Sequence, residues 1–176
     1  MLARRSSRHS NTGIYADIYA SALVPGRMPA LMEKVGRLFD ANSSFMFTSH
    51  SEQHPEAILL SQNLCPRMVD GFREYWNTED VWALAAARKG MMRRNVVVTG
   101  TELVPMAELQ RSRFYNEFGR DCGMGSMLGS VLFDGGENDA AGIPFTNLCW
   151  YRPHGRDDFG REQVRRLRHL LPHFQE

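Results

Sequence analysis

The sequence lacks several features that mark common classes of protein. Its 176 residues contain no run of about 18 apolar residues, so no membrane-spanning helix is predicted. The net charge is only +1, which argues against a broad basic field for nucleic acid. The three cysteines, Cys65, Cys122 and Cys149, are odd in number and far apart, which argues against a disulfide framework and for a reducing cytosol. We therefore expect a soluble, cytoplasmic protein.

Motifs of catalysis, metal binding and cofactor binding are also missing. There is no Gly-x-Ser-x-Gly elbow, no Walker-type phosphate loop, no dinucleotide fingerprint, and no Cys-x-x-Cys or His-Glu-x-x-His pair. His50 and His54 lie close in sequence, and His169 and His173 share one helical face, but neither pair has the further ligands that a zinc site needs. We expect no metal, no cofactor and no enzymatic activity.

The chain does contain enough apolar material for one folded domain. Hydrophobic residues make up 43% of it and aromatic residues 10%, as in globular proteins. Residues 1–10 carry three arginines with no apolar run behind them, which predicts a basic flexible tail and no secretory signal. No low-complexity linker interrupts the remainder, so residues 11–176 are predicted to form a single domain.

Hydrophobic periodicity predicts alternating helices and strands, with Thr12, Thr78 and Asp158 as helix N-caps. The short connection at 134–139 predicts an antiparallel pair of strands before the last helix. The fold class is therefore α+β, with a central antiparallel sheet, helices packed on it, and helices at both ends. The predicted helices span 12–25, 28–39, 66–76, 78–89, 105–120 and 158–174, and the predicted strands span 44–50, 57–60, 95–99, 124–133 and 143–151.

Aromatic residues gather in three places: residues 72–82, residues 114–118 and the strand that contains Trp150. A ligand pocket needs mostly apolar walls and a few placed polar groups. Asp80 lies within the first cluster and is predicted to be the polar anchor. The alternative is that each ring simply packs in the core, where aromatic residues are abundant. The predicted ligand-binding residues are Tyr75, Trp76, Asp80, Trp82, Phe114, Phe118 and Trp150.

Three segments in the last third of the chain carry a recognisable pattern: Phe-Tyr-Asn-Glu-Phe at 114–118, Arg-Pro-His-Gly-Arg at 152–156, and Leu-Leu-Pro-His-Phe at 170–174. Together they resemble the N-terminal sensor half of LuxR-type transcription regulators, over about residues 14–174. The resemblance implies a PAS- or GAF-like domain for a small molecule, with 170–174 as the connector to a helix-turn-helix half. That half would follow Glu176, so DNA would be contacted only through a domain missing from this chain.

The Tyr75–Trp82 region resembles the Tyr-rich segment that precedes an Asp-Pro-Trp motif in this family, but it departs from that motif at one residue. Where the family has Asp-Pro-Trp, this chain reads Asp80-Val81-Trp82 and lacks the proline. Phe72, Tyr75 and Trp76 also do not reproduce the Trp and Tyr spacing of acyl-homoserine-lactone receptors. The sequence therefore leaves the class of ligand open.

These observations support one leading hypothesis and two alternatives. The leading one is a ligand-sensing domain of a cytoplasmic regulator, homodimeric through apolar stripes on its first and last helices. The alternatives are a ligand-free dimerisation module whose own side chains fill the pocket and, less favoured, a small enzyme that uses Asp80 or Cys122. No segment has base-reading residues after a tight turn, so the chain alone is predicted not to bind specific DNA sequences.

Overall fold

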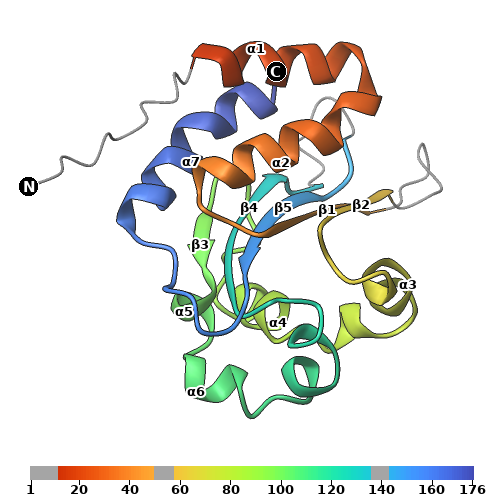
Figure 1. Cartoon of the computed structure of the whole chain (residues 1–176), viewed down its shortest axis with the longest axis vertical. Helices are drawn as coiled ribbons and strands as arrows, with labels where there is room; N and C mark the ends of the chain where they lie inside the picture. The colour runs from red at the N-terminus through yellow and green to blue at the C-terminus, as the bar shows by residue number, and fades with distance from the viewer. Residues whose placement is uncertain (1–11, 50–57, 136–142) are drawn as a thin grey trace, which may run out of the picture.

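A five-stranded antiparallel sheet lies between two groups of helices in the computed structural model, which describes residues 12–49, 58–135 and 143–176 (Figure 1). The strand order is β2-β1-β5-β4-β3. This architecture confirms the predicted α+β class with a central antiparallel sheet. The strands are β1 (Ser43–Thr48), β2 (Ile58–Gln62), β3 (Val97–Thr99), β4 (Ser126–Phe133) and β5 (Thr146–Arg152).

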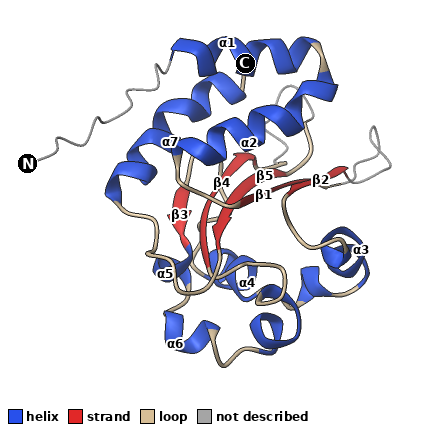
Figure 2. Cartoon of the chain, in the orientation of Figure 1, coloured by secondary structure: helices blue, strands red, loops and turns tan. Residues whose placement is uncertain are grey.

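The central strand β5 is buried on both faces, because helices cover the sheet on each side (Figure 2). It pairs with β1 on one side, where Phe45 lies opposite Cys149, and with β4 on the other, where Leu128 lies opposite Trp150. Side chains alternate along a strand. Trp150 therefore points to one face of the sheet, and Cys149 and Tyr151 point to the other.

Three long helices cover the Trp150 face: α1 (Thr12–Leu23), α2 (Met28–Leu38) and α7 (Arg161–Phe174) (Figure 1). α7 buries Leu167, Leu170 and Leu171 at helical spacing, while its arginines face outward. The end of the chain lies beside α1, where the Tyr19 hydroxyl is 2.7 Å from His173 Nδ1. The Trp150 face is thus covered by a helical layer in which the N-terminal helix α1 contacts the C-terminal helix α7.

Shorter helices cover the opposite face: α3 (Arg67–Glu74), α4 (Val81–Arg88), α5 (Gly100–Leu103) and α6 (Met106–Leu109). The segment 76–78 forms a 3-10 helix, and Tyr115–Gly119 forms a π-helix. Met68, Phe72, Phe114 and Phe118 are buried in the core beneath them. This layer holds the candidate site described below.

Two predicted helix caps are wrong. The N-cap of α4 is Asp80, not Thr78, since the Asp80 carboxylate accepts hydrogen bonds from the backbone of the first turn and Thr78 donates to the Tyr75 carbonyl. Asp158 does not cap α7, which begins after Gly160, whose backbone N–H donates to the Gln163 side chain. In both regions several residues suited to capping stand close together, and the fold selects among them.

The predicted continuous helix over 105–120 is also wrong. It divides into α6 and the π-helix because polar side chains take up backbone groups between them. Ser112 Oγ donates to the Leu109 carbonyl and accepts from the Tyr115 N–H, and Asn116 Nδ2 donates to the carbonyls of Gln110 and Ser112. Such side chain–backbone bonds compete with the regular helical ladder.

Contrary to expectation, two of the cysteines form a disulfide. Cys65, between β2 and α3, is bonded to Cys122, which follows the π-helix, and their Cα atoms are 4.8 Å apart. Nearby, Arg67 pairs with Asp121 at 2.9 Å. The prediction that the cysteines do not pair is therefore wrong, and the cysteines no longer argue for a reducing cytosol. Cys149 remains a free, buried thiol.

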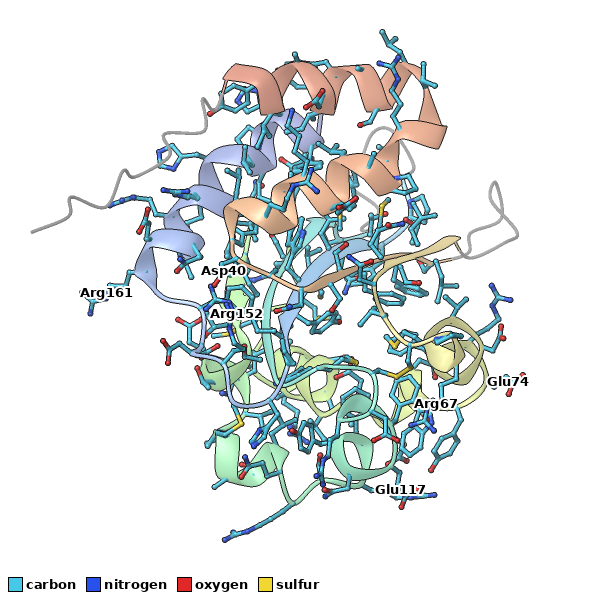
Figure 3. The ribbon with its side chains drawn as sticks, viewed as in Figure 1. Asp40, Arg67, Glu74, Glu117, Arg152 and Arg161 are labelled. Carbon is cyan, nitrogen blue, oxygen red and sulfur yellow. A yellow bond between two sulfur atoms is a disulfide. The ribbon has the colours of Figure 1, made fainter. Side chains whose placement is uncertain are left out.

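Arg152 fixes the end of β5 to the surrounding backbone. Its side chain is only 7% exposed, and its guanidinium donates to four carbonyls: Phe39 at 2.6 Å, Asp40 at 3.0 Å, Asp157 at 2.8 Å and Asp158 at 3.1 Å. Figure 3 shows Arg152 beside Asp40. The arginine of the 152–156 turn thus ties β5 both to the end of α2 and to the residues that lead into α7.

Some predictions fall outside the described residues. The basic tail at 1–10, the His50 and His54 pair, and most of the 134–139 connection belong to this group. Within the described ranges, no helix combines the length and apolarity that crossing a bilayer requires.

Candidate functional site

A cavity of about 60 Å³ lies between α4, β3 and the Cys149 face of the sheet. Its floor comes from β4 and β5, its wall from α4, and its rim from the segment that leads into β3. The cavity is too small for a bulky ligand as it stands. Its lining residues are Asp80, Trp82, Ala83, Ala86, Met91, Met92, Val96, Val98, Leu103, Met127, Gly129, Ser130, Val131, Asn147, Cys149 and Tyr151.

The floor follows from strand alternation. Asn147, Cys149 and Tyr151 are alternate residues of β5 and line the cavity together. On the neighbouring strand, Gly129 lies opposite Cys149. A Cβ at Gly129 would come within 2.8 Å of Met127 Sδ and 3.1 Å of Cys149 Sγ. The missing side chain therefore lets the sulfur atoms of Met127 and Cys149 pack closely over the centre of the sheet.

Asp80 is the charged residue of the site, held in place as the N-cap of α4. Its Oδ1 accepts hydrogen bonds from the backbone N–H of Trp82 at 2.9 Å and of Ala83 at 3.2 Å. Burial raises the pKa of its carboxyl from 3.8 to about 6, although these two hydrogen bonds act in the opposite direction. The helix thus positions a carboxylate whose negative charge is only partly compensated.

The groups beside Asp80 remain neutral. Burial, reinforced by the Asp80 charge, raises the pKa of the Cys149 thiol to about 12. Burial likewise raises the pKa of the Tyr151 hydroxyl well above 10, with the neighbouring Cys149 and Asp80 acting in the same direction. Because a thiol attacks only as its thiolate, Cys149 is a poor nucleophile here. The arrangement is suited to binding and offers no activated nucleophile at this position.

Two of the seven predicted site residues, Asp80 and Trp82, line the cavity. Trp82 is buried, and its ring lies 6.1 Å from that of Tyr151 and 6.1 Å from that of Phe114. Its Nε1 is buried without a hydrogen-bond partner among the described residues. The predicted site and the cavity therefore overlap at the beginning of α4.

Three further predicted residues pack on one another behind the cavity. The ring of Trp76 stacks on Phe118 at 5.3 Å, and Phe114 lies 5.8 Å from Phe118. Both phenylalanines are 1% exposed. In this part of the aromatic cluster the rings fill the space themselves, as the core-packing alternative describes.

Tyr75 and Trp150 lie apart from the cavity. Tyr75 is 40% exposed, and its hydroxyl accepts a hydrogen bond from Arg113 at 2.8 Å. Trp150 occupies the opposite face of the sheet, where its Nε1 donates to the Met32 carbonyl at 3.1 Å and its ring packs edge-on to Phe39. The structure does not bring these two residues to the same site.

Most of the cavity lining was not identified from the sequence. The alternation of β5 could have placed Cys149 and Tyr151 opposite Trp150, so this signal was present. The methionines at 91 and 92 and the glycine at 129 have no comparable signal, because their role depends on which strands pair. Within the described ranges, no three His, Cys, Asp or Glu residues gather as a metal site.

Comparisons with known proteins identify a structural neighbour but no sequence relative. No known family matches the sequence, and no curated protein matches it. Among solved structures, the fold is similar to the ligand-binding domain (LBD) of VqsR from Pseudomonas aeruginosa, with a TM-score of 0.60. The match covers 92% of this chain and 89% of that one, at 12% sequence identity. At this identity the likeness establishes the shared fold.

Proposed function

We propose that this chain is the small-molecule-sensing domain of a LuxR-type transcription regulator, and that the cavity beneath α4 is its ligand site. In this proposal residues 11–176 form one sensing domain, which works in the cytoplasm as a homodimer. The domain has no catalytic role, and it acts on DNA only through a separate DNA-binding domain. Ligand binding shifts the balance between two states of the domain.

Three observations support the proposal. The 114–118, 152–156 and 170–174 segments resemble the sensor half of LuxR-type regulators, and the fold resembles a domain named as ligand-binding. The observation that carries it is local: a charged group, Asp80, faces an apolar cavity at the start of a helix. Apolar walls with a few fixed polar groups are typical of small-molecule sites.

A ligand-free dimerisation module is the second candidate, favoured by the packing of Trp76, Phe114 and Phe118 on one another. The two functions differ in whether the cavity holds a ligand. In a ligand-free module, filling the cavity leaves the function of the protein unchanged. In a sensor, filling it abolishes ligand retention while the fold remains.

Ala86→Leu tests this difference, because Ala86 is buried on α4 and lines the cavity. The matched control is Ala87→Leu, the same change at the next, exposed residue. Native mass spectrometry of protein purified from its own host is expected to show a retained small molecule with the parent and the control, and none with Ala86→Leu. Thermal melts check that both variants are folded. Parent protein that carries no molecule, and that no fraction of a host extract stabilises, would rule out the sensor.

A further inference from the structure

The cavity beneath α4 presents hydrogen-bond acceptors that lack partners. Asp80 Oδ1 accepts both backbone N–H groups of the helix start, which leaves Oδ2 without a hydrogen bond to any described residue. Asn147 Oδ1 is buried on the floor of the same cavity and also has no partner among the described residues. Asn147 Oδ1 is fully enclosed, so leaving it unpaired is costly, whereas Asp80 is half-buried at the edge of the cavity.

Several hydrogen-bond donors around the cavity already have an acceptor, and another points away from Asp80 and Asn147 Oδ1. Ser130 Oγ donates to the Val96 carbonyl at 3.0 Å, and Asn147 Nδ2 donates to Cys149 Sγ at 3.8 Å. The unpaired Trp82 Nε1 lies against Gly100, where a Cβ would come within 3.0 Å of it. The Tyr151 hydroxyl and the Cys149 thiol are hydrogen-bonded to each other. Asp80 Oδ2 and Asn147 Oδ1 thus remain as acceptors without a donor among these groups.

No cation compensates Asp80 among the described residues that line the cavity, since none of them is Lys, Arg or His. Of the cations in the flanking segment 88–94, Arg88 and Arg93 do not line the cavity, and Lys89 and Arg94 are engaged elsewhere. Lys89 Nζ donates to the carbonyls of Glu102 at 2.7 Å and Leu103 at 2.8 Å, and the Arg94 guanidinium lies over the Phe133 ring. A carboxylate with no counter-charge in an apolar cavity is costly, and an incoming positive charge removes that cost.

We infer that the ligand of this cavity is a small organic cation, with a primary ammonium group directed at Asp80 and a short apolar body against the methionines of the rim and floor, Met91, Met92 and Met127. Asn147 Oδ1 supplies a second acceptor, and the rings of Trp82 and Tyr151 add faces that attract cations. A carboxylate or phosphate ligand is repelled by Asp80 and finds no cation there. The inference rests on the proposed function and names the chemical class that this site takes.

Three probes of similar size separate the head groups: n-butylamine, n-butanol and butyrate. Binding is followed by NMR of ¹³C-methyl methionine, because Met91, Met92 and Met127 line the cavity while Met32 lies in the core of the other face. We expect n-butylamine to bind at pH 7.5 at least about tenfold more tightly than n-butanol, as the loss of a charge-assisted hydrogen bond implies. We expect butyrate to leave the cavity methyls unshifted.

Asp80→Asn is the diagnostic variant, because asparagine keeps the helix cap and removes the charge. It is expected to lower n-butylamine affinity to that of n-butanol while leaving n-butanol affinity unchanged. The matched control is Glu79→Gln, which removes the neighbouring carboxylate outside the cavity and is expected to leave all affinities unchanged. Parent affinity for n-butylamine is expected to fall below about pH 6, as Asp80 takes up a proton. Of the other titratable groups facing Asp80, Cys149 and Tyr151 stay neutral in this range.

The outcomes separate this inference from the proposed function. If n-butanol or butyrate binds as tightly as n-butylamine, the cavity is a ligand site of another class and the inference is wrong. The inference is equally wrong if Asp80→Asn leaves the amine preference intact. If none of the probes shifts the cavity methyls at millimolar concentration, both the inference and the cavity's role as a ligand site fail.

Discussion

Asp80 has two roles at the scale of single residues: it caps α4, and it brings a charge to the cavity. The two roles have opposite effects on stability, because capping stabilises a helix by about 1 kcal/mol while burying a carboxylate destabilises the fold. The residue is therefore a local compromise of the kind that is common at binding sites. Changes at Asp80 can separate the two contributions.

Asp80→Asn is predicted to change how stability depends on pH. The folded pKa of about 6 lies above the ordinary 3.8, so the folded state binds the proton more tightly than the unfolded state. In the parent, this group's contribution to the free energy of unfolding is therefore greatest below pH 3.8, falls as pH rises through 6, and is level above it. The variant lacks this decline, and at pH 7 it is expected to be more stable by up to about 3 kcal/mol, since asparagine caps as well as aspartate.

Urea unfolding of the parent and Asp80→Asn between pH 4 and pH 8 measures this difference. Asp80→Ala serves as the control, because it removes both the charge and the cap. A constant gap between parent and Asp80→Asn across the whole pH range would mean that Asp80 is not the titrating group.

Gly125 lies at a close backbone crossing beneath the 152–156 turn. Its N–H donates to the Arg152 carbonyl at 2.8 Å, and a Cβ there would come within 2.3 Å of His154 N and 2.5 Å of the Pro153 carbonyl carbon. Backbone cannot move aside as a flexible side chain does. Gly125→Ala is therefore expected to lower the free energy of unfolding by about 3 kcal/mol or more.

The control for this change is Gly26→Ala, where nothing lies within 4 Å of the added Cβ. Thermal melts of the two variants make the comparison. Equal melting temperatures would show that the 152–156 turn lies farther from Gly125 than these distances indicate.

At the scale of elements, the Cys65–Cys122 disulfide joins the beginning of α3 to the end of the π-helical segment. It closes a chain segment with a sequence separation of 57, for which loop-closure entropy gives about 4 kcal/mol of stabilisation. Reduction is expected to lower the melting temperature by about 10 °C. The prediction is checked by thermal melts with and without a reducing agent.

The double variant Cys65→Ala/Cys122→Ala is the control, and its melting temperature is expected to be insensitive to the reducing agent. Cys149 should contribute nothing to the effect, since its thiol is buried and free. A parent protein whose melting temperature is unchanged by reduction would contradict the pairing.

At the scale of the whole molecule, the apolar stripes expected to form a dimer are used within the chain. Ile14 and Ile18 of α1 and Leu167 and Leu171 of α7 are buried against one another in the core of the Trp150 face. The apolar side chains that α1 and its end still expose are Tyr19, Leu23 and Val24, of which Leu23 is 85% exposed. The proposed homodimer therefore rests on this smaller surface.

Leu23→Asp is expected to convert a homodimer to a monomer at tens of micromolar, because it places a charge in an apolar contact. Light scattering measures the mass. Leu84→Asp is the control: Leu84 is similarly apolar and 44% exposed, but it lies on α4 in the opposite layer. Parent protein that is already monomeric at this concentration would argue against the homodimer.

The order of the elements and the central antiparallel sheet with helices packed on it could be predicted from local sequence patterns. Period 3.6 and period 2 are local properties of the chain, so α2, α7, β4 and β5 follow from a few neighbouring residues. The cluster of aromatic residues around Asp80 likewise predicted a site at the beginning of α4. Where several polar residues stand together, as at Thr78 and Asp80, local preference could not choose the cap.

Which residues lie opposite one another depends on long-range packing. The Cys65–Cys122 pair joins segments far apart in sequence, and no spacing rule connects them. The cavity needs α4, Gly129 and the Cys149 face of β5 together, and it exists only because β4 and β5 pair in one register. A register is set by packing across the whole sheet, and only that packing decides that the Cys149 face of β5 lines the cavity. Alternation along β5 then places Trp150, a predicted ligand contact, on the far face.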